Sequence, residues 1–358
     1  MNIQDLEQTW INQFDKPLVI GGPCSAESEK QVMEIAEKLD KNYVQVFRAG
    51  IWKPRTKPGN FEGVGAIGLN WLKRVKDELG MPVATEVANA SHARLALEFD
   101  IDYLWIGARS TVSPFIVQEI AEALRDTDKV VLVKNPVNPD LDLWIGALER
   151  LAAQGIKKLG VIHRGFSSHN KSKYRNEPQW QIALELKDKF PNLPILCDPS
   201  HITGRRDLIF EIAQQAFNLE YNGLMIETHC HPDEAWSDAK QQILPETLKE
   251  ILVDLTLRKK NDTSDRYSTL LSQYRNEIDN IDNQLLGLLA SRMDISKKIG
   301  KLKKEHNVAI FQADRWNVLK KLAIRNGVRM GLSKDFLDQL LVSIHKESVE
   351  LQNQIMKE

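Results

Sequence analysis

The sequence predicts two folds in one chain: an α/β fold closed as a (β/α)8 TIM barrel, followed by an all-α unit of three helices. Eight short apolar runs alternate with amphipathic stretches in the first 257 residues. All 14 prolines and 15 of the 19 glycines lie at or before Pro245. Beyond that point apolar residues recur at helical spacing. We therefore divide the chain into a barrel over 1–257, a polar linker over 258–266 and a helical domain over 267–358.

The strands of the barrel are expected at the apolar runs, which are 18–21, 43–47, 82–87, 103–106, 129–133, 158–162, 194–197 and 223–226. The helices between them include 28–40, 66–79, 115–125, 143–154, 178–189 and 206–217. Because the strands are apolar on both faces, the sheet should be parallel and covered by helices. Eight such units in about 250 residues match a closed barrel. An open doubly wound sheet is the alternative, but no GxGxxG follows the first strand.

The helical domain should begin with one long helix over 267–304. Its apolar stripe runs through Leu271, Tyr274, Ile278, Ile281, Leu285, Leu288, Ile295, Ile299 and Leu302. At about 1.5 Å per residue this helix would span roughly 57 Å. That is too long to bury its stripe inside one small domain, so a second copy of the chain is the expected partner. Two further helices are expected near 313–326 and 334–356.

Composition and charge exclude several classes of protein. The chain is 42% apolar and 27% charged with a net charge of -1, which is typical of a soluble globular protein. No apolar run approaches the ~20 residues of a membrane span, and the acidic first residues are unlike a signal peptide. Neither half is basic enough to indicate nucleic acid as a partner. The three cysteines form no CxxC and favour a reducing cytoplasm.

Reactive or charged residues follow every predicted strand. They are Cys24, Arg48, Glu86, Arg109, Lys134, His163 with Arg164, Asp198 with His201, and Glu227 with His229. In a (β/α)8 barrel these strand ends meet at one mouth, so we expect an active site there. Cys24, His201, Glu227 and nearby acids suit a divalent transition ion. The cations Arg48, Lys53, Arg55, Arg109, Lys134 and Arg164 indicate an anionic ligand with more than one phosphate or carboxylate, and Thr56 adds a hydroxyl.

Two alternatives stay open at this point. A cysteine such as Cys24, taken alone, is more often a small buried apolar residue than a metal ligand. The run His229-Cys230-His231 is a second candidate metal site, although adjacent strand residues point to opposite sides and would not bind one ion together.

Seven ordered motifs then carry a resemblance. They are GPCS (22–25), KPRT (53–56), IGAR (106–109), VKN (133–135), HRG (163–165), DPSH (198–201) with GRR after it, and WSDAKQ (236–241). Over about residues 15–257 the chain resembles 3-deoxy-D-arabino-heptulosonate-7-phosphate (DAHP) synthase, the first enzyme of the shikimate pathway, in its type I-beta branch without the extra regulatory domain. A related synthase makes an eight-carbon sugar acid from arabinose 5-phosphate, but it carries a different loop where KPRT stands.

The resemblance implies the roles of the barrel residues. It places one divalent metal ion, with Mn²⁺ expected first, on Cys24, His201, Glu227 and Asp238. It places phosphoenolpyruvate (PEP) on Arg48, Lys53, Arg109, Lys134 and Arg164, of which the last four would be catalytic. Arg55 and Thr56 would hold erythrose 4-phosphate. The chain departs from the branch at Lys134-Asn135-Pro136, where Lys-Arg-Gly is common, so the loop after the retained lysine is expected to differ.

Polar residues interrupt the helical stripe at a few positions. Arg292 lies on the stripe, and Lys303 lies eleven residues later, three turns plus about 20° around the helix. Ser348 and Gln352, four apart on the last helix, could face both cations across the bundle. One interpretation is a polar layer that sets the register of a coiled coil. The other is a pocket for a small anion.

The stretches 274–292, 297–303 and 347–352 resemble the all-helical AroQ-type chorismate mutases. The resemblance implies that chorismate binds Arg275, Arg292, Lys303, Arg315, Ser348 and Gln352, with Lys303 and Gln352 catalytic, and that two chains entwine so that Arg275 reaches the partner's site. The chain departs from the family at Gln312 and Trp316, where acids are usual, so a weaker mutase is expected. The combined expectation is a bifunctional enzyme inhibited by prephenate. A non-catalytic dimerisation and sensor domain for chorismate or prephenate is the alternative.

Overall fold

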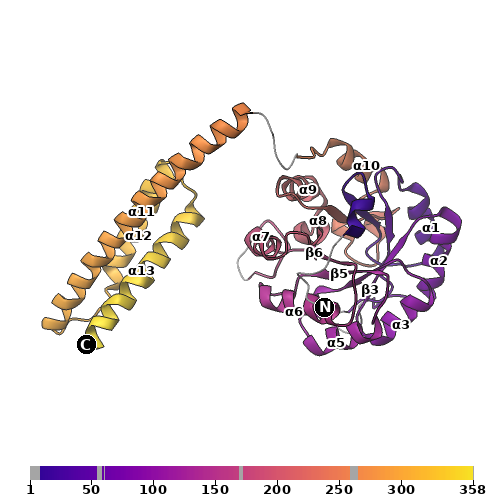
Figure 1. Cartoon of the computed structure of the whole chain (residues 1–358), viewed down its shortest axis with the longest axis horizontal. Coiled ribbons are helices and arrows are strands. Elements are labelled where there is room, and N and C mark those ends of the chain that lie inside the picture. The colour runs from indigo at the N-terminus through magenta and orange to yellow at the C-terminus, as the bar shows by residue number, and fades with distance from the viewer. Residues whose placement is uncertain (1–8, 55–58, 60, 169–171, 259–264, 358) are drawn as a thin grey trace. The chain divides into compact units, whose positions relative to one another are not determined.

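The computed structural model describes residues 9–54, 59, 61–168, 172–258 and 265–357. The chain separates into two compact units, Met1–Lys260 and Asn261–Glu358, which we describe one at a time (Figure 1). Among the described residues, no helix is both long enough and apolar enough to cross a membrane.

The first unit is a closed barrel of eight parallel strands in sequence order, as predicted. The strands are β1 (Leu18–Gly22), β2 (Val46–Arg48), β3 (Val83–Val87), β4 (Tyr103–Ile106), β5 (Val130–Lys134), β6 (Leu159–His163), β7 (Ile195–Cys197) and β8 (Gly223–Glu227). Pairing of β1 with β8, from Leu18 opposite Gly223 to Gly22 opposite Glu227, closes the barrel. The open-sheet alternative is therefore wrong.

Helices surround the strands (Figure 1). They are α1 (Glu29–Lys38), α2 (Ile67–Leu79), α3 (Ala90–Glu98), α4 (Ala108–Thr111), α5 (Pro114–Ala123), α6 (Leu141–Ala153), α7 (Trp180–Lys189), α8 (Pro199–Thr203), α9 (Ile209–Asn218) and α10 (Pro245–Asp254). Side-chain caps fix several starts, because Ser28, Asn89, Asp140 and Asp198 each accept a hydrogen bond from a backbone N–H three residues later. The short helices α4 and α8 begin directly after β4 and β7, and they position Arg109 and His201.

The barrel has two apolar layers. The inner layer fills the barrel with the inward residues of the strands, among them Ile20, Trp105, Leu132 and Met225. Trp10 packs against this layer, and its indole N–H donates to the carbonyl of Leu159. A larger outer layer lies between strands and helices. Helices therefore cover strands that are buried throughout, which is why the strand sequences are apolar without alternation.

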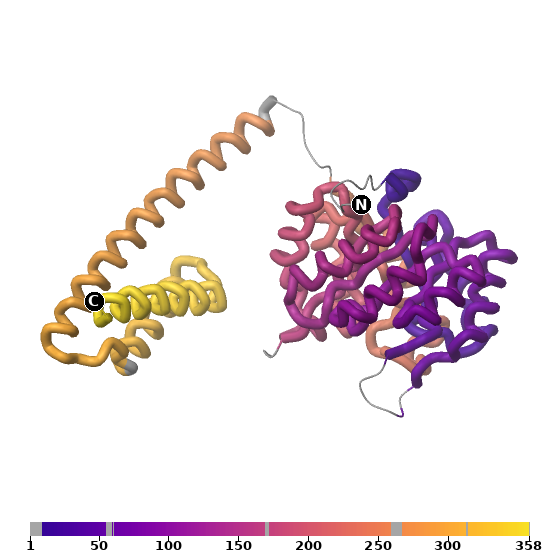
Figure 2. Tube along the Cα trace, turned by 60° about the horizontal axis from the view of Figure 1, so that its bottom comes forward, coloured from indigo at the N-terminus to yellow at the C-terminus, as the bar shows by residue number. Residues whose placement is uncertain are grey.

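The second unit consists of α11 (Asp265–Glu305), α12 (Ala313–Arg329) and α13 (Lys334–Lys357), close to the expected ranges. α13 packs along α11, and the N-terminal part of α11 extends past both shorter helices (Figures 1 and 2). The apolar stripe of that part is exposed in the single chain: Ile278, Leu285 and Leu288 are 56%, 52% and 69% accessible. Much of the stripe therefore lacks a packing partner within this chain.

Candidate functional site

A compact donor group lies at the mouth of the barrel. One ligand atom each from Cys24, Glu227 and Asp238 lie within 4.8 Å of one another. Nε2 of His201 lies 3.7 Å from Oε1 of Glu227 and 4.0 Å from Oδ2 of Asp238. Cys24 follows β1, His201 lies in α8, Glu227 ends β8, and Asp238 lies in the loop after β8. They present one sulfur, one nitrogen and two carboxylates, a set that fits a divalent transition ion.

Neighbouring side chains hold these donors in place. Nη2 of Arg48 donates to Oε1 of Glu227 at 3.1 Å, and Nε2 of Gln241 donates to Oε2 at 2.7 Å. Nδ1 of His201 lies 2.8 Å from Oδ2 of Asp198, so the imidazole presents Nε2 to the donor group. Gly22 allows β1 to approach β2 here, since a Cβ at its φ of 145° would lie 2.1 Å from the carbonyl oxygen of Arg48.

Burial and charge set the protonation of the donors. Burial, reinforced by the Glu227 charge, raises the pKa of the Cys24 thiol to about 12. Burial alone would raise the pKa of Asp238, but the neighbouring His201 and the cations Arg175 and Lys53 outweigh it and lower that pKa. Burial lowers the pKa of His201 and favours the neutral imidazole. A neutral imidazole and ionised carboxylates are the forms that bind a metal, while Cys24 must lose a proton on binding.

Cations surround the donor group. Nζ of Lys53 donates to the carbonyl of Cys24 at 2.6 Å, and Nζ of Lys134 lies 2.8 Å from Oδ2 of Asp198. Arg164 is held by Asn176, whose Oδ1 accepts from Nη1 at 2.8 Å. A pocket at the mouth is lined by Lys53, Pro54, Glu86, Arg109, Arg164, Arg175, His201 and Asp238. Most of its charged side chains are cationic, so it can accept a polyanion.

Arg48 keeps spare hydrogen-bonding capacity at this site. Its guanidinium is buried and lies over the ring of Trp105, 4.8 Å from the ring centroid. Nε and Nη1 of Arg48 are buried and have no hydrogen-bond partner among the described residues. Buried donors of this kind are costly to leave unsatisfied, so a bound carboxylate or phosphate would stabilise them.

Some predicted residues are not at the mouth. His163 lies in the outer layer, where its Nδ1 lies 2.9 Å from the Tyr221 hydroxyl and its Nε2 lies 2.6 Å from the Pro178 carbonyl. Nε2 of His229 lies 3.5 Å from Oε2 of Glu27. Cys230 and His231 lie with Glu34 of α1 instead. Arg55 and Thr56 fall outside the described residues.

Three residues that the structure places at the mouth had no predicted role, although Gln241 lies within the WSDAKQ motif. Arg175 contacts Oδ1 of Asp238 at 3.0 Å, Gln241 contacts Glu227, and Asn176 holds Arg164. Arg175 and Asn176 lie in the segment between β6 and α7, which has no periodicity. Their position after a strand of the barrel was the one usable signal.

The helical unit brings some of its six predicted residues into contact and leaves others exposed. Nη1 of Arg292 on α11 donates to Oγ of Ser348 on α13, and Nζ of Lys303 donates to the carbonyl of Ile310. Gln352 is buried and packs against Gly300 of α11, and its Oε1 has no hydrogen-bond partner among the described residues. Arg275 and Arg315 are exposed.

The two departures from the expected mutase pattern lie near α12. Gln312 precedes this helix and is exposed. Trp316 stacks on His345 of α13, with ring centroids 4.0 Å apart and planes inclined by 14°. An aromatic pair therefore occupies the place where the resemblance leads one to expect a carboxylate.

Comparison with known proteins supports both units. The family profile described as "DAHP synthetase I family" matches residues 3–261, and that described as "Chorismate mutase type II" matches residues 274–353. A phospho-2-dehydro-3-deoxyheptonate aldolase of Thermotoga maritima is 33% identical, over 66% of this chain and 68% of its own length. A 2-dehydro-3-deoxyphosphooctonate aldolase of Desulfotalea psychrophila is 28% identical, over 66% of this chain and 88% of its own length.

Solved structures agree. The crystal structure of a DAHP synthase from Thermotoga maritima superposes with a TM-score of 0.60 at 31% identity, covering 67% of this chain and 68% of that one. A truncated form of the 3-deoxy-D-arabino-heptulosonate 7-phosphate synthase of the same organism gives a TM-score of 0.58 at 30% identity, covering 67% and 85%. The chain belongs to the DAHP synthetase I family and carries, after its barrel, a chorismate mutase type II domain, so that it joins a transferase and an isomerase of the shikimate pathway.

Proposed function

We propose that the barrel condenses PEP with erythrose 4-phosphate to give DAHP and phosphate, and that the helical domain rearranges chorismate to prephenate. The observation that carries the first reaction is the juxtaposition of the donor group with the ring of cations at one barrel mouth. A substrate with a phosphate and a carboxylate matches that charge. The domain boundaries we use, 1–257, 258–266 and 267–358, are part of this proposal.

Cys24, His201, Glu227 and Asp238 would hold one divalent metal ion, for which Mn²⁺ is our first candidate. The mixed sulfur, nitrogen and oxygen set supports this assignment. When bound, such an ion supplies Lewis-acid polarisation of the aldehyde oxygen of erythrose 4-phosphate.

The cations would orient PEP. Lys53, Arg109, Lys134 and Arg164, with Arg48, can pair with its phosphate and carboxylate, and Asn176 holds Arg164 in position to do so. C3 of PEP then bonds to the aldehyde carbon, water adds at C2, and phosphate leaves. Holding two anionic substrates in line supplies the proximity that free solution lacks. We assign erythrose 4-phosphate to Arg55 and Thr56.

The mutase reaction needs no nucleophile. Arg292, held by Ser348, would pair with a carboxylate of chorismate, and Arg315 and the Arg275 of a second copy would complete the site. Lys303 and Gln352 would stabilise the negative charge that grows on the ether oxygen as its bond breaks. The buried, unpaired Oε1 of Gln352 supports a polar ligand at this place.

The exposed stripe of α11 supports a homodimer formed through the helical domain. We further propose that prephenate inhibits the synthase and that the enzyme acts in the cytoplasm. A helical domain that only dimerises and senses chorismate or prephenate is the alternative. The exposure of Arg275 and Arg315 in the single chain is compatible with it.

A pair of full-length variants tests both reactions. With erythrose 4-phosphate present, Cys24→Ala should release phosphate from PEP at least about 100-fold more slowly, because it removes a donor from the proposed metal site. Its chorismate consumption should be unchanged. Lys303→Ala should reduce chorismate consumption by about 100- to 1,000-fold, because it removes the cation that would stabilise the charge on the ether oxygen. Its synthase rate should be unchanged.

Cys197→Ala is the matched control, since this buried thiol packs in the outer layer and not among the donors. It should retain both activities. Full synthase activity of Cys24→Ala after chelation and metal replenishment would refute the ligand assignment. Undiminished chorismate turnover by Lys303→Ala would favour the sensor alternative or another catalytic group.

A further inference from the structure

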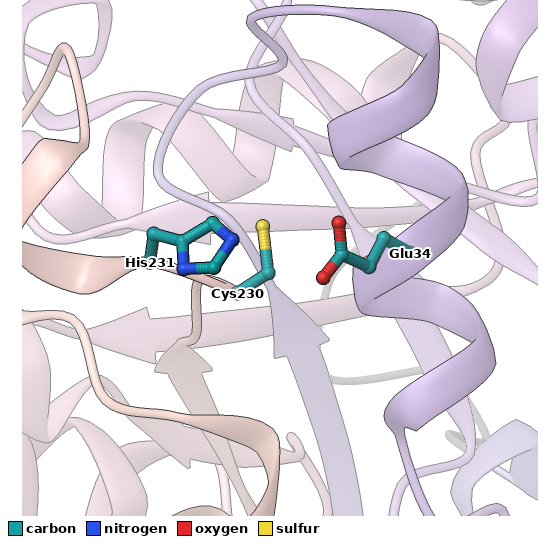
Figure 3. A group of neighbouring side chains, drawn as sticks. All are labelled: Glu34, Cys230 and His231. Carbon is teal, nitrogen blue, oxygen red and sulfur yellow. The ribbon is translucent and has the colours of Figure 1, made fainter.

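The run His229-Cys230-His231 after β8 has no role in the two reactions. The structure separates its members. His229 is buried and faces Glu27, whereas Cys230 and His231 lie beside Glu34 of α1. Figure 3 shows the sulfur of Cys230 between the imidazole of His231 and the carboxylate of Glu34. One ligand atom from each lies within 4.8 Å of the other two.

This spacing suits a small metal ion. A tetrahedral zinc site has Zn–S near 2.3 Å and Zn–N near 2.0 Å, so its ligand atoms lie about 3.3–3.8 Å apart. From a separation within 4.8 Å, the atoms would have to approach one another by at most about 1.5 Å, which small side-chain rotations allow. Cys230 is 6% exposed, while His231 is exposed and the Glu34 side chain is 29% exposed. The cluster therefore has a buried thiol and an open side through which an ion and water can reach it.

The observed partner of Glu34 leaves room for this use. Nζ of Lys38 lies 2.8 Å from Oε1 of Glu34, one turn along α1, and the pair is partly exposed to solvent. Ion pairs of this kind contribute little to stability. The contact with Lys38 uses Oε1 of Glu34, which leaves Oε2 for another partner. Glu34 can therefore keep Lys38 on one oxygen and offer the other to an ion.

We propose that Glu34, Cys230 and His231 form a second metal site, distinct from the donor group at the mouth, that binds Zn²⁺ or Co²⁺ with water as the fourth ligand. Binding replaces the S–H bond of Cys230 by a sulfur–metal bond and releases one proton. The ion would join α1 to the loop after β8, and the same loop carries Asp238 of the mouth. Occupancy of this outer site would thus fix the loop that supplies a donor to the first site.

Cobalt titration of the full chain tests the proposal, because a thiolate–Co²⁺ bond gives a charge-transfer absorption band. Cys24→Ser removes the thiol of the mouth, so a band in this variant must come from another cysteine. We expect the Cys24→Ser chain, stripped of metal with a chelator, to develop the band. The double variant Cys24→Ser/Cys230→Ser should not develop it.

The other ligands are tested in the Cys24→Ser background by Zn²⁺ competition against bound Co²⁺. His231→Ala and Glu34→Gln should each weaken metal binding at Cys230 at least about tenfold. Lys38→Ala is the control, since it removes the partner of Glu34 but no ligand, and it should bind metal at least as tightly. His231 and Glu34 lie partly in solvent, so these variants should fold even where a change at Cys230 does not.

The proposal is overturned if Cys24→Ser gives no band, or if the band persists in the double variant and therefore belongs to Cys197. It also fails if His231→Ala and Glu34→Gln bind Co²⁺ as tightly as Lys38→Ala does.

Discussion

His163 shows how one residue at a strand end can serve stability instead of chemistry. Its two ring nitrogens are matched by the Pro178 carbonyl and the Tyr221 hydroxyl, and Trp144, Phe166 and Trp180 surround the ring. Burial lowers the pKa of this imidazole from its ordinary 6.5 to about 4. The folded chain therefore keeps His163 neutral at a pH where the unfolded chain protonates it.

The free energy of unfolding should fall as the pH falls from 7 to 4 because of this residue. Well above pH 6.5 His163 is neutral in both the folded and the unfolded state, so it adds nothing to the pH dependence of stability. Below pH 6.5 His163 binds a proton in the unfolded state but stays neutral in the folded state. This difference lowers the free energy of unfolding by about 3 kcal/mol at pH 4. Denaturant unfolding of the full chain and of His163→Phe at both pH values measures this contribution.

His163→Phe removes the titrating group but keeps the aromatic packing. The informative quantity is therefore how its free energy of unfolding changes with pH, and not the free energy at one pH. We expect the variant to lose about 3 kcal/mol less than the unchanged chain over this interval. Equal losses in the two proteins would show that His163 is not the buried, neutral group that the structure describes.

The sequence located most of the mouth because a parallel barrel gathers every strand's carboxyl end at one place. Cys24, Glu227 and Lys134 needed no side-chain geometry to be found. Which of two adjacent residues faces inward depends on the alternation of side chains along the strand. In β6, Val161 packs in the outer layer and Ile162 in the inner layer, so His163 packs outward and Arg164 reaches the mouth. Arg175 was not predicted, because it lies in a long loop after β6 in which strand periodicity gives no signal.

At the scale of elements, the exposed apolar stripe of α11 has no packing partner within the described part of one chain. Its residues were predicted as a helix because the apolar stripe keeps the helical period over the whole length. In the single chain the stripe stays exposed at Ile278, Leu285 and Leu288. α13 covers only the C-terminal part of α11 (Figure 2). Burying the remaining part requires another surface, and we propose the same stripe of a second copy.

Leu285→Lys should therefore convert the dimer into a monomer, because it places a charge in the centre of the stripe. Asn283→Lys is the matched control, since position 283 lies about 200° away around the helix. Sedimentation velocity should show a single-chain species for the first variant and a dimer for the second. If the Arg275 of the partner completes the mutase site, Leu285→Lys should also lose most chorismate turnover. A dimer in both variants would place the interface elsewhere.

The extents of the elements were less predictable than their existence. β2 begins at Val46, later than the apolar run suggested. Just before it, Gln45 bonds to Val19 twice, donating its backbone N–H to the carbonyl and accepting from the backbone N–H with its side-chain oxygen. The short helices α4 and α8 also carry too few residues for a periodic signal. Yet α8 is fixed by Asp198, which caps its start and also lies beside His201 and Lys134. The Asp198 carboxylate thus caps α8 and also holds His201 and Lys134 at the mouth.

At the scale of the whole molecule, the distribution of proline and glycine reflects two kinds of architecture. The turns of the barrel use proline and glycine, whereas the long helices after residue 260 exclude proline. The two units belong to families of the same pathway, and we propose that they catalyse an early and a late step of it. The concentration of prephenate, the proposed product of the second unit, would then rise with the rate of the first unit. This is the basis for our proposal that prephenate inhibits the synthase.

Prephenate should inhibit the synthase of the full chain but not that of a chain that ends at Lys260. A ligand can shift the activity of the barrel only by as much as it binds two states of the protein differently, and we place its binding site in the helical domain. Removing that domain should remove the inhibition whatever it does to the basal rate. Phosphate release from PEP, measured with and without prephenate on both chains, is the test. Equal inhibition of the shortened chain would move the prephenate site into the barrel.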